Sequence, residues 1–170
     1  MKIMMSAGEA SGDLHGASLA KEMLAMEPSV ELMGFGGGKM AEAGVRLVRD
    51  CRDYSIMGFW EVVLGLPRLL ALEKALVDAM REEKPDLLLI IDYPDFNWRL
   101  AAKAKALGIP VFSYIPPSVW AWRKGRAKKC ASLAKEIVAI FHHEIGPYLD
   151  AGANISFLGN PLVDTVRADM

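Results

Sequence analysis

Short apolar runs recur along this chain, and a segment of helical character separates each run from the next. The clearest run is 86–91 (DLLLII), and residues 2–6 open the chain with another. Strands that are buried on both faces of a sheet have continuous apolar sequences of this kind, because no face is left for polar side chains. Strands that alternate with helices predict an α/β fold built on a parallel sheet.

The same pattern predicts the other elements. Further strands are expected at 30–35, 45–48, 109–114, 137–141 and 155–158. Helices are expected at 13–26, 39–43, 67–83, 96–107 and 123–135, and Gly108 is expected to close the fourth of them. No repeat, low-complexity tract or linker divides the sequence. A chain of 170 residues is long enough for one well-buried domain and too short for two.

Composition narrows the classes of function. Apolar residues make up 52% and charged residues 24%, as is typical of a globular protein. The formal net charge of −1 argues against general nucleic-acid binding, although five of the seven residues in 123–129 are basic. Two cysteines, in no metal-like spacing, predict a reducing compartment. We expect no signal peptide and no membrane span, since no stretch reaches the ~20 apolar residues that a span needs.

The loop 6–13 (SAGEASGD) follows the first strand and opens a helix, the position at which open α/β sheets bind ligands. Gly8 and Gly12 would let the backbone approach a ligand closely, and free amides at a helix start suit an anion. The glycine spacing does not match the dinucleotide fingerprint. Glu9 would repel a phosphate but could hydrogen-bond sugar hydroxyls. For Asp13 a helix N-cap is the favoured interpretation.

A second glycine cluster, 34–38, contains a G-x-G-x-x-A match at Gly36, Gly38 and Ala41. It follows a strand and precedes a short helix, so a phosphate role is one interpretation. A single match of this kind is weak. Packing in a tight turn is the favoured interpretation.

The segment 91–97 (IDYPDFN) follows the strongest strand. Asp92 is expected where the strand's carboxyl end meets the ligand crevice, with Pro94 keeping the turn extended. A carboxylate there can act as a general base if partial burial raises its pKa. Asp95 is expected to cap the next helix. Metal catalysis is not expected, because three histidines have no evident ligand partners: His15, His142 and His143.

The segment 115–126 (IPPSVWAWRKGR) combines tandem prolines, two tryptophans and three cations. The prolines cannot donate ladder hydrogen bonds, so the preceding strand must end here. Trp120 and Trp122 alone would be expected to complete the core. Their combination with cations at a strand's carboxyl end favours a site for an anionic ligand. The cations are Arg123, Lys124 and Arg126.

The segment 56–72 (IMGFWEVVLGLPRLLAL) carries only two charges. A buried core helix is one interpretation. Its apolar residues cover more than one helical face and are interrupted by Gly65 and Pro67, as is typical of a surface patch for a membrane or a lipid substrate, and the residues alone leave both interpretations open. The patch residues are Phe59, Trp60, Val62, Val63, Leu66, Leu69 and Leu70.

Together these segments resemble one family, the lipid-A-disaccharide synthases, which are glycosyltransferases. The matching stretches follow the family's order over nearly the whole chain: SAGEASGDLHGA, the glycine cluster before KMAEAG, IMGFWEVV, KPDLLLIIDYPDFN, LGIPVFSYIPPSVWAWRKGR and FLGNPLVD. The first loop and PSVWAWR are the most specific of them. The chain departs from the family's pattern at Pro116, Asn160 and 142–143.

The resemblance implies a Rossmann-like parallel sheet with helices on both faces, like the N-terminal domain of a GT-B glycosyltransferase. Residues 1–170 would form a single acceptor-side domain, and the C-terminal donor-binding domain would be absent. The implied reaction is an inverting, metal-independent transfer, with no cofactor, of 2,3-diacylglucosamine from its UDP conjugate to 2,3-diacylglucosamine 1-phosphate. The implied location is the cytoplasm, peripheral to the inner membrane; no nucleic acid is expected, and a homodimer is left open.

Residue roles follow from the resemblance as well. The family's catalytic carboxylate falls on Asp92, and an essential acidic residue of the first loop falls on Glu9. The apolar patch matches a membrane-seated segment that would hold acyl chains. Substrate-binding roles are implied for Gly8, Ser11, Gly12, Asn97, Ser118 and Arg123.

Two other interpretations remain. An isolated half cannot enclose a donor, so the chain could be a non-catalytic lipid-binding or interaction module derived from that half. A nicotinamide-binding domain is disfavoured because the dinucleotide fingerprint is missing.

Overall fold

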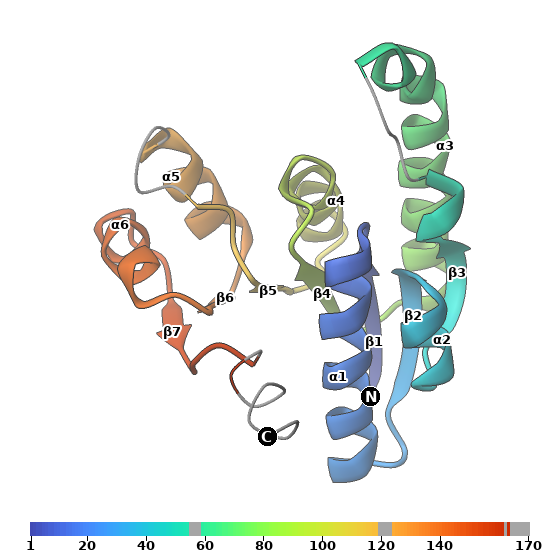
Figure 1. Cartoon of the computed structure of the whole chain (residues 1–170), viewed down its shortest axis with the longest axis horizontal. Helices are drawn as coiled ribbons and strands as arrows, with labels where there is room; N and C mark the ends of the chain where they lie inside the picture. The colour runs from blue at the N-terminus through green and yellow to red at the C-terminus, as the bar shows by residue number, and fades with distance from the viewer. Residues whose placement is uncertain (55–58, 119–123, 162, 164–170) are drawn as a thin grey trace.

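The computed structural model describes residues 1–54, 59–118, 124–161 and 163, with the main chain alone described for 59–65 and 124. The described residues form a seven-stranded sheet of order β3-β2-β1-β4-β5-β6-β7, and every neighbouring pair is parallel. The strands are β1 (Lys2–Ala7), β2 (Glu31–Gly36), β3 (Arg46–Asp50), β4 (Leu87–Ile91), β5 (Val111–Tyr114), β6 (Glu136–Ala139) and β7 (Ile155–Phe157). Figure 1 shows this order from β7 at the left to β3 at the right. The prediction of an α/β fold with a parallel sheet is confirmed.

Helices connect the strands and cover both faces of the sheet (Figure 1). They are α1 (Ala10–Met26), α2 (Gly38–Glu42), α3 (Phe59–Glu83), α4 (Pro94–Ala106), α5 (Lys124–Leu133) and α6 (Ile145–Asp150), with short 3-10 turns η1 (Cys51–Tyr54) and η2 (His142–Glu144). One core cluster lies between the sheet and α3, α4, α5 and α6, and the other lies between the sheet and α1 with α2. The Rossmann-like arrangement implied by the resemblance is therefore present.

The central strands show why their sequences are apolar throughout. Leu88 and Ile90 of β4 join the cluster under α3–α6, whereas Leu89 and Ile91 join the cluster under α1 and α2. Successive side chains of a strand point to opposite faces, so a strand covered on both sides must be apolar at every position. The carboxyl end of β4 is therefore buried on both faces of the sheet.

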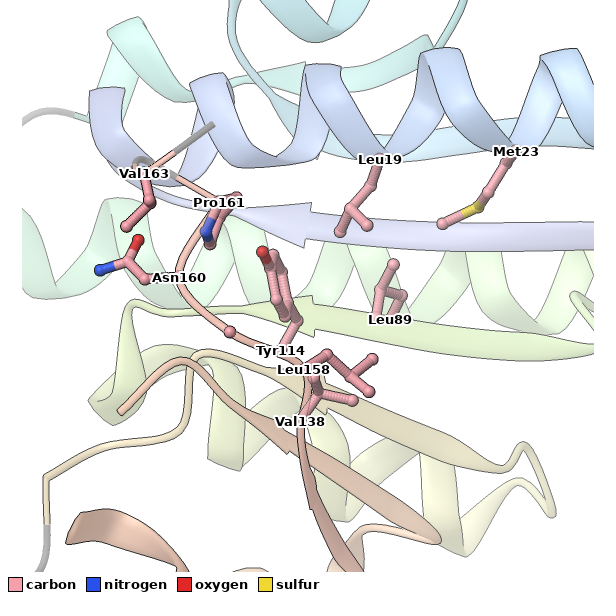
Figure 2. Close-up of a pocket in the computed structure, with 10 residues that line it drawn as sticks. Leu19, Met23, Leu89, Tyr114, Val138, Leu158, Asn160, Pro161 and Val163 are labelled. Atoms are coloured by element: carbon pink, nitrogen blue, oxygen red, sulfur yellow. The ribbon is translucent and has the colours of Figure 1, made fainter. Parts of the chain in front are cut away.

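The face that carries α1 and α2 is covered over β1 and β2 but open further along the sheet. There, Leu89, Tyr114 and Val138 of successive strands line an apolar groove of about 520 Å³. Leu19 of α1 forms one side and Leu158 the other (Figure 2). Within the described residues, β5 and β6 thus keep an apolar face that no helix covers.

Several predicted boundaries are wrong. Helix α1 begins at Ala10, three residues before its predicted start, and α3 runs through Gly65 and Pro67 without a break. Helix α4 begins at Pro94, because proline is favoured in the first turn of a helix, where its missing N–H costs nothing. Gly108 follows α4 with a φ of 76°, which confirms its predicted role as the residue that closes the helix.

Candidate active site

The topology places one crevice at the carboxyl edge of the sheet. From β1 the chain winds through β2 to β3 on one side, and β4 then pairs with β1 on the other side. The connections that leave β1 and β4 therefore diverge, which is the switch point at which open α/β sheets bind ligands. The last pair in this ladder is Ala7 with Ile91, so Gly8 and Asp92 leave the sheet side by side.

The turn after β4 has an uncommon backbone. Asp92 and Tyr93 have φ values of 47° and 51°, in the left-handed region, so the expectation of an extended turn before Pro94 is wrong. The Asp92 N–H donates to the carbonyl of Tyr114 (3.1 Å), and the Asn97 N–H donates to the carbonyl of Tyr93 (3.0 Å). Non-glycine residues in this region are held there by their surroundings and cluster at functional sites. This turn fixes the direction in which the Asp92 side chain leaves β4.

Asn97 joins the ends of β1 and β4. Its Oδ1 accepts the Ser6 hydroxyl (2.6 Å), and its Nδ2 donates to the carbonyls of Ser6 (3.0 Å), Ile91 (3.2 Å) and Asp92 (2.8 Å). The side chain is fully buried. The prediction that Asn97 binds substrate is not supported, because its amide group is already engaged; the residue positions the site instead.

The Asp92 carboxylate is partly exposed and makes no hydrogen bond or ion pair with the described residues. Its charge acts on two neighbours. It opposes the lowering of the His15 pKa, which burial causes, and it adds to the raising of the Glu144 pKa. Asp92 therefore combines a fixed backbone with a carboxylate that the described residues leave open for a ligand.

The first loop leaves the sheet beside the Asp92 turn, because β1 and β4 are paired to their last residues. Glu9 is exposed, its carbonyl accepts the Asp13 N–H (2.8 Å), and its side chain caps nothing. Burial raises the pKa of the Tyr93 phenol, and the Glu9 charge raises it further. The Glu9 carboxylate is thus electrostatically coupled to the β4 turn, at the carboxyl edge of the sheet where the loop was predicted.

Gly8 and Gly12 have a packing reason to be glycine. A Cβ on Gly8 would lie 2.2 Å from Cδ1 of the Tyr93 ring. One on Gly12 would lie 3.2 Å from the Ala7 Cβ and 3.5 Å from the Ile91 carbonyl oxygen. Both residues are buried, whereas Ser11 is exposed. Ligand contacts of these three residues stay predictions.

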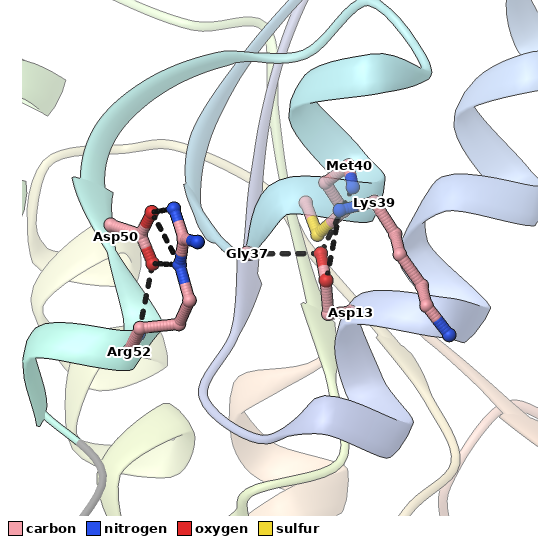
Figure 3. A network of polar contacts seen from close by, with 6 residues as sticks. All are labelled: Asp13, Gly37, Lys39, Met40, Asp50 and Arg52. Carbon is pink, nitrogen blue, oxygen red and sulfur yellow. Dashed lines mark hydrogen bonds and ion pairs between the residues drawn. The ribbon is translucent and has the colours of Figure 1, made fainter.

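Asp13 caps a helix, but not the predicted one. It is a buried residue within α1, and its carboxylate accepts three N–H groups at the start of α2: Gly37 (2.8 Å), Lys39 (3.1 Å) and Met40 (3.0 Å). Figure 3 shows these contacts. The second glycine cluster therefore already holds an anion supplied by the protein. This excludes a phosphate at these amides and confirms the packing interpretation.

Asp95 was predicted to cap α4, and this is wrong. The N-cap is Tyr93, and Asp95 lies in the first turn, where it pairs with Arg126 of α5 (2.5 Å). Carboxylates are also favoured in the first turn of a helix, so Asp95 does mark the start of α4, two residues after the N-cap.

Two residues, Glu144 and Tyr148, form hydrogen bonds with the segment after β5, and the sequence gave little indication of either contact. Ser118 is exposed, and its hydroxyl donates to the Glu144 carboxylate (3.0 Å). The Tyr148 hydroxyl donates to the Pro117 carbonyl (2.9 Å). Sequence reasoning missed Glu144; the available signal was an acidic residue shortly after an apolar strand. Ser118 was predicted to bind substrate, and its exposure next to Glu144 leaves that prediction untested.

Part of the predicted apolar patch can be placed. Leu66 and Leu70 are 50% and 48% exposed, one turn apart on α3. Leu69 is partly buried and packs on the core, so it does not belong to an exposed patch. The predicted residues Phe59, Trp60, Val62 and Val63 have side chains outside the described part of the structure. Arg123, Trp120 and Trp122 also lie outside the described residues.

Two searches of the described residues bear on the class of function. No group of three or more His, Cys, Asp or Glu side chains comes together as metal ligands would. None of the helices there is long and apolar enough to cross a membrane.

The sheet order and the crevice define a Rossmann-like domain of the kind that forms one half of GT-B glycosyltransferases and related epimerases. Solved structures share this fold. UDP-GlcNAc 2-epimerase from Neisseria meningitidis, bound to UDP-GlcNAc, matches 96% of this chain with 47% of its own (13% identity, TM-score 0.64). MurG from Acinetobacter baumannii matches 94% with 45% of its own (12% identity, TM-score 0.60).

Sequence comparison gives the family. The model of the lipid-A-disaccharide synthetase family matches residues 3–170. Lipid-A-disaccharide synthase of Syntrophus aciditrophicus is 46% identical over 166 residues, and that of Myxococcus xanthus is 42% identical over 165. The chain belongs to the lipid-A-disaccharide synthase family. These alignments cover 98% and 97% of the chain but only 43% of each relative, so the chain spans less than half of their length.

Proposed function

We propose that this chain forms the acceptor-side half of a lipid-A-disaccharide synthase, with Asp92 as the general base. In the proposed reaction, Asp92 takes the proton from an acceptor hydroxyl of 2,3-diacylglucosamine 1-phosphate. The hydroxyl oxygen bonds to the anomeric carbon of UDP-2,3-diacylglucosamine as the bond from that carbon to the UDP oxygen breaks. UDP leaves with the bonding electrons, and the anomeric configuration inverts.

The observation that carries this proposal is the Asp92 turn. A carboxylate held at the switch point by a left-handed backbone, and left open by the described residues, has the position that a general base needs. Glu9, in the adjacent loop after β1, would orient the sugar through its hydroxyl groups. The donor would be held by the part of the relatives that this chain does not span.

The test compares Asp92→Asn with the control Asp95→Asn. Asp95 is a nearby carboxylate whose side chain is 86% exposed. Transfer is measured with both substrates and a separately made C-terminal half of a relative. General-base catalysis contributes typically 10²–10⁴-fold, so Asp92→Asn should lower the rate by about that factor. Asp95→Asn should change it less than about threefold, because exposed ion pairs contribute little. Retained activity in folded Asp92→Asn would refute the assignment of the base.

A non-catalytic lipid-binding module is the second candidate, and the exposed apolar side chains of Leu66 and Leu70 on α3 support lipid contact. Turnover by the mixture of halves would support a divided enzyme. Absence of turnover in every combination, together with lipid binding by the chain alone, would favour the module.

For either candidate we propose contact with the cytoplasmic face of the inner membrane through the first half of α3. The exposed pair Leu66 and Leu70 supports this contact, since neighbouring apolar side chains on a helix surface bind an acyl boundary. Flotation with anionic liposomes should decrease for Leu66→Ser with Leu70→Ser. Leu149→Ser, at a residue that is 56% exposed on α6, is the matched control and should float as the wild type does. Unchanged flotation of the double variant would refute the patch.

A further inference from the structure

Two buried side chains on one helical face, Glu144 and Tyr148, form hydrogen bonds with the segment that follows β5. Glu144 ends η2 and Tyr148 follows four residues later in α6; their exposed fractions are 2% and 0%. The Tyr148 hydroxyl donates to the Pro117 carbonyl, and the Ser118 hydroxyl donates to the Glu144 Oε1. Residues four apart lie on the same face of a helix, so these contacts hold two consecutive residues from one side.

The segment they grip is part of the crevice. Ile115, at the end of β5, has a φ of 60°, and its N–H donates to the carbonyl of Val138 in β6 (3.0 Å). A β-branched residue in the left-handed region is rare and persists only where the surroundings impose it. The preceding residue, Tyr114, accepts the N–H of Asp92. The grip on Pro117 and Ser118 therefore fixes a backbone that is bonded directly to the Asp92 turn.

The Glu144 carboxyl group is unusual for a buried acid. Its Oε2 is buried and has no hydrogen-bond partner. Burial raises the pKa of Glu144, and the negative charge of Asp92 raises it further; the Ser118 hydrogen bond and the charge of the adjacent His143 act in the opposite direction. Burial raises the pKa of the neighbouring Tyr148 phenol, and the charge of Arg126 on α5 lowers it. Desolvation favours the neutral form of an acid, and a second negative charge near Asp92 would repel a phosphate.

We propose that Glu144 is a positioning residue of the acceptor site: as a neutral carboxylic acid it anchors Ser118 and, with Tyr148, holds the β5 exit beside Asp92. The acceptor is a sugar phosphate, so this arrangement leaves Asp92 as the charged carboxylate on this side of the crevice. The inference rests on the proposed function for the identity of the acceptor. The state of Glu144 itself does not depend on it.

The first experiment needs no ligand. The side-chain carboxyl carbons of ¹³C-labelled protein are followed by NMR as the pH is raised, in the wild type and in Ser118→Ala. Glu144 should titrate at a pH above 4.5, the ordinary glutamate pKa, and at still higher pH in Ser118→Ala, because the bond from Ser118 stabilises the ionised form. Titration of Glu144 at or below that ordinary pKa would overturn the proposal.

The second experiment measures binding of a short-chain, soluble 2,3-diacylglucosamine 1-phosphate by calorimetry. Glu144→Gln keeps a neutral group of the same shape and should bind within about threefold of the wild type. Glu144→Ala and Ser118→Ala should each bind about tenfold more weakly, the factor expected when a hydrogen bond of roughly 1.4 kcal/mol is lost. Glu42→Ala is the control and should bind as the wild type does.

The outcomes separate the two proposals. Equal losses in Glu144→Gln and Glu144→Ala would show that an ionised carboxylate is needed and would overturn the neutral role. Wild-type affinity in both Glu144→Ala and Ser118→Ala would overturn the positioning role. Ser118 is exposed, so its variant keeps this test valid if Glu144→Ala fails to fold. A wild-type chain that does not bind the acceptor would overturn the proposed function and the acceptor role of Glu144 together, while the titration still decides the state of Glu144.

Discussion

The contact between Asp13 and the start of α2 predicts a large loss of stability in Asp13→Ala. The carboxylate accepts hydrogen bonds from Gly37, Lys39 and Met40, and only 7% of Asp13 is exposed. The substitution leaves buried N–H groups without an acceptor, and water cannot readily replace it. Helix α2 has only five residues, so it has little internal hydrogen bonding with which to compensate.

The magnitude follows from the number of contacts. A hydrogen bond to a charged group contributes about 1.5–3 kcal/mol, and the contributions of one shared acceptor are not additive. A loss of a helix cap alone costs about 0.5–2 kcal/mol. We therefore expect Asp13→Ala to lower the free energy of unfolding by roughly 3–5 kcal/mol, a large part of the ~5–15 kcal/mol of a typical domain.

Equilibrium urea unfolding, followed by circular dichroism, measures this loss. Glu42→Ala is the matched control, since Glu42 is an exposed carboxylate of the same short helix, and a change below about 0.5 kcal/mol is expected. The loss of stability in Asp13→Asn should lie between those of Asp13→Ala and Glu42→Ala, because one acceptor oxygen remains while the new amide NH₂ faces an N–H donor. A loss below about 1 kcal/mol in Asp13→Ala would refute the reasoning that this carboxylate occupies the amides of the second glycine cluster.

Three further predictions concern the site and the core. Gly8→Ala should destabilise the fold by about 1–3 kcal/mol through its clash with the Tyr93 ring; in a double-mutant cycle, Tyr93→Ala should relieve much of it, and additive losses would contradict the clash. The stability of the wild type relative to Glu144→Gln should fall as pH rises above 4.5, the ordinary pKa, because the unfolded Glu144 then loses its proton while the folded one retains it; a pH series of urea midpoints measures this, and a difference that rises with pH would contradict it. Burial raises the pKa of the Cys130 thiol to about 11, and 1% of the residue is exposed, so Ellman's reagent at pH 8 should modify it only on unfolding; rapid modification of the native protein would show that the site opens.

Local sequence pattern predicted the elements and the edge of the sheet that carries the site. The run 86–91 was predicted to be a doubly covered strand, because a short run of consecutive apolar residues is typical of strands that are buried on both faces of a sheet. Asp92 and Glu9 could be assigned to the crevice because Asp92 directly follows β4, Glu9 lies two residues after β1, and parallel strands end at one edge of the sheet.

Residues whose partners are distant in sequence could not be assigned in this way. Asp13 lies 24 residues from Gly37, and Asn97 lies 91 residues from Ser6, yet each pair is in direct hydrogen-bond contact. A sequence shows that such a residue is polar and near a helix start, and the local N-cap is then the natural interpretation. The choice between capping its own helix, capping another and binding substrate depends on which backbone amides the fold brings near.

Glu144 shows most clearly the difference between what a sequence predicts and what only the tertiary structure decides. Its sequence context, a short polar stretch after a strand, is equally typical of an exposed turn. Burial, the contact with Ser118 and the proximity of Asp92 arise only when β4, β5 and β6 are laid side by side and their carboxyl ends meet. Hydrophobic periodicity is a local property and determined the strands, the helices and the position of the crevice. The protonation and reach of the groups in the crevice depend on desolvation and on contacts between distant segments, and those only the tertiary structure decided.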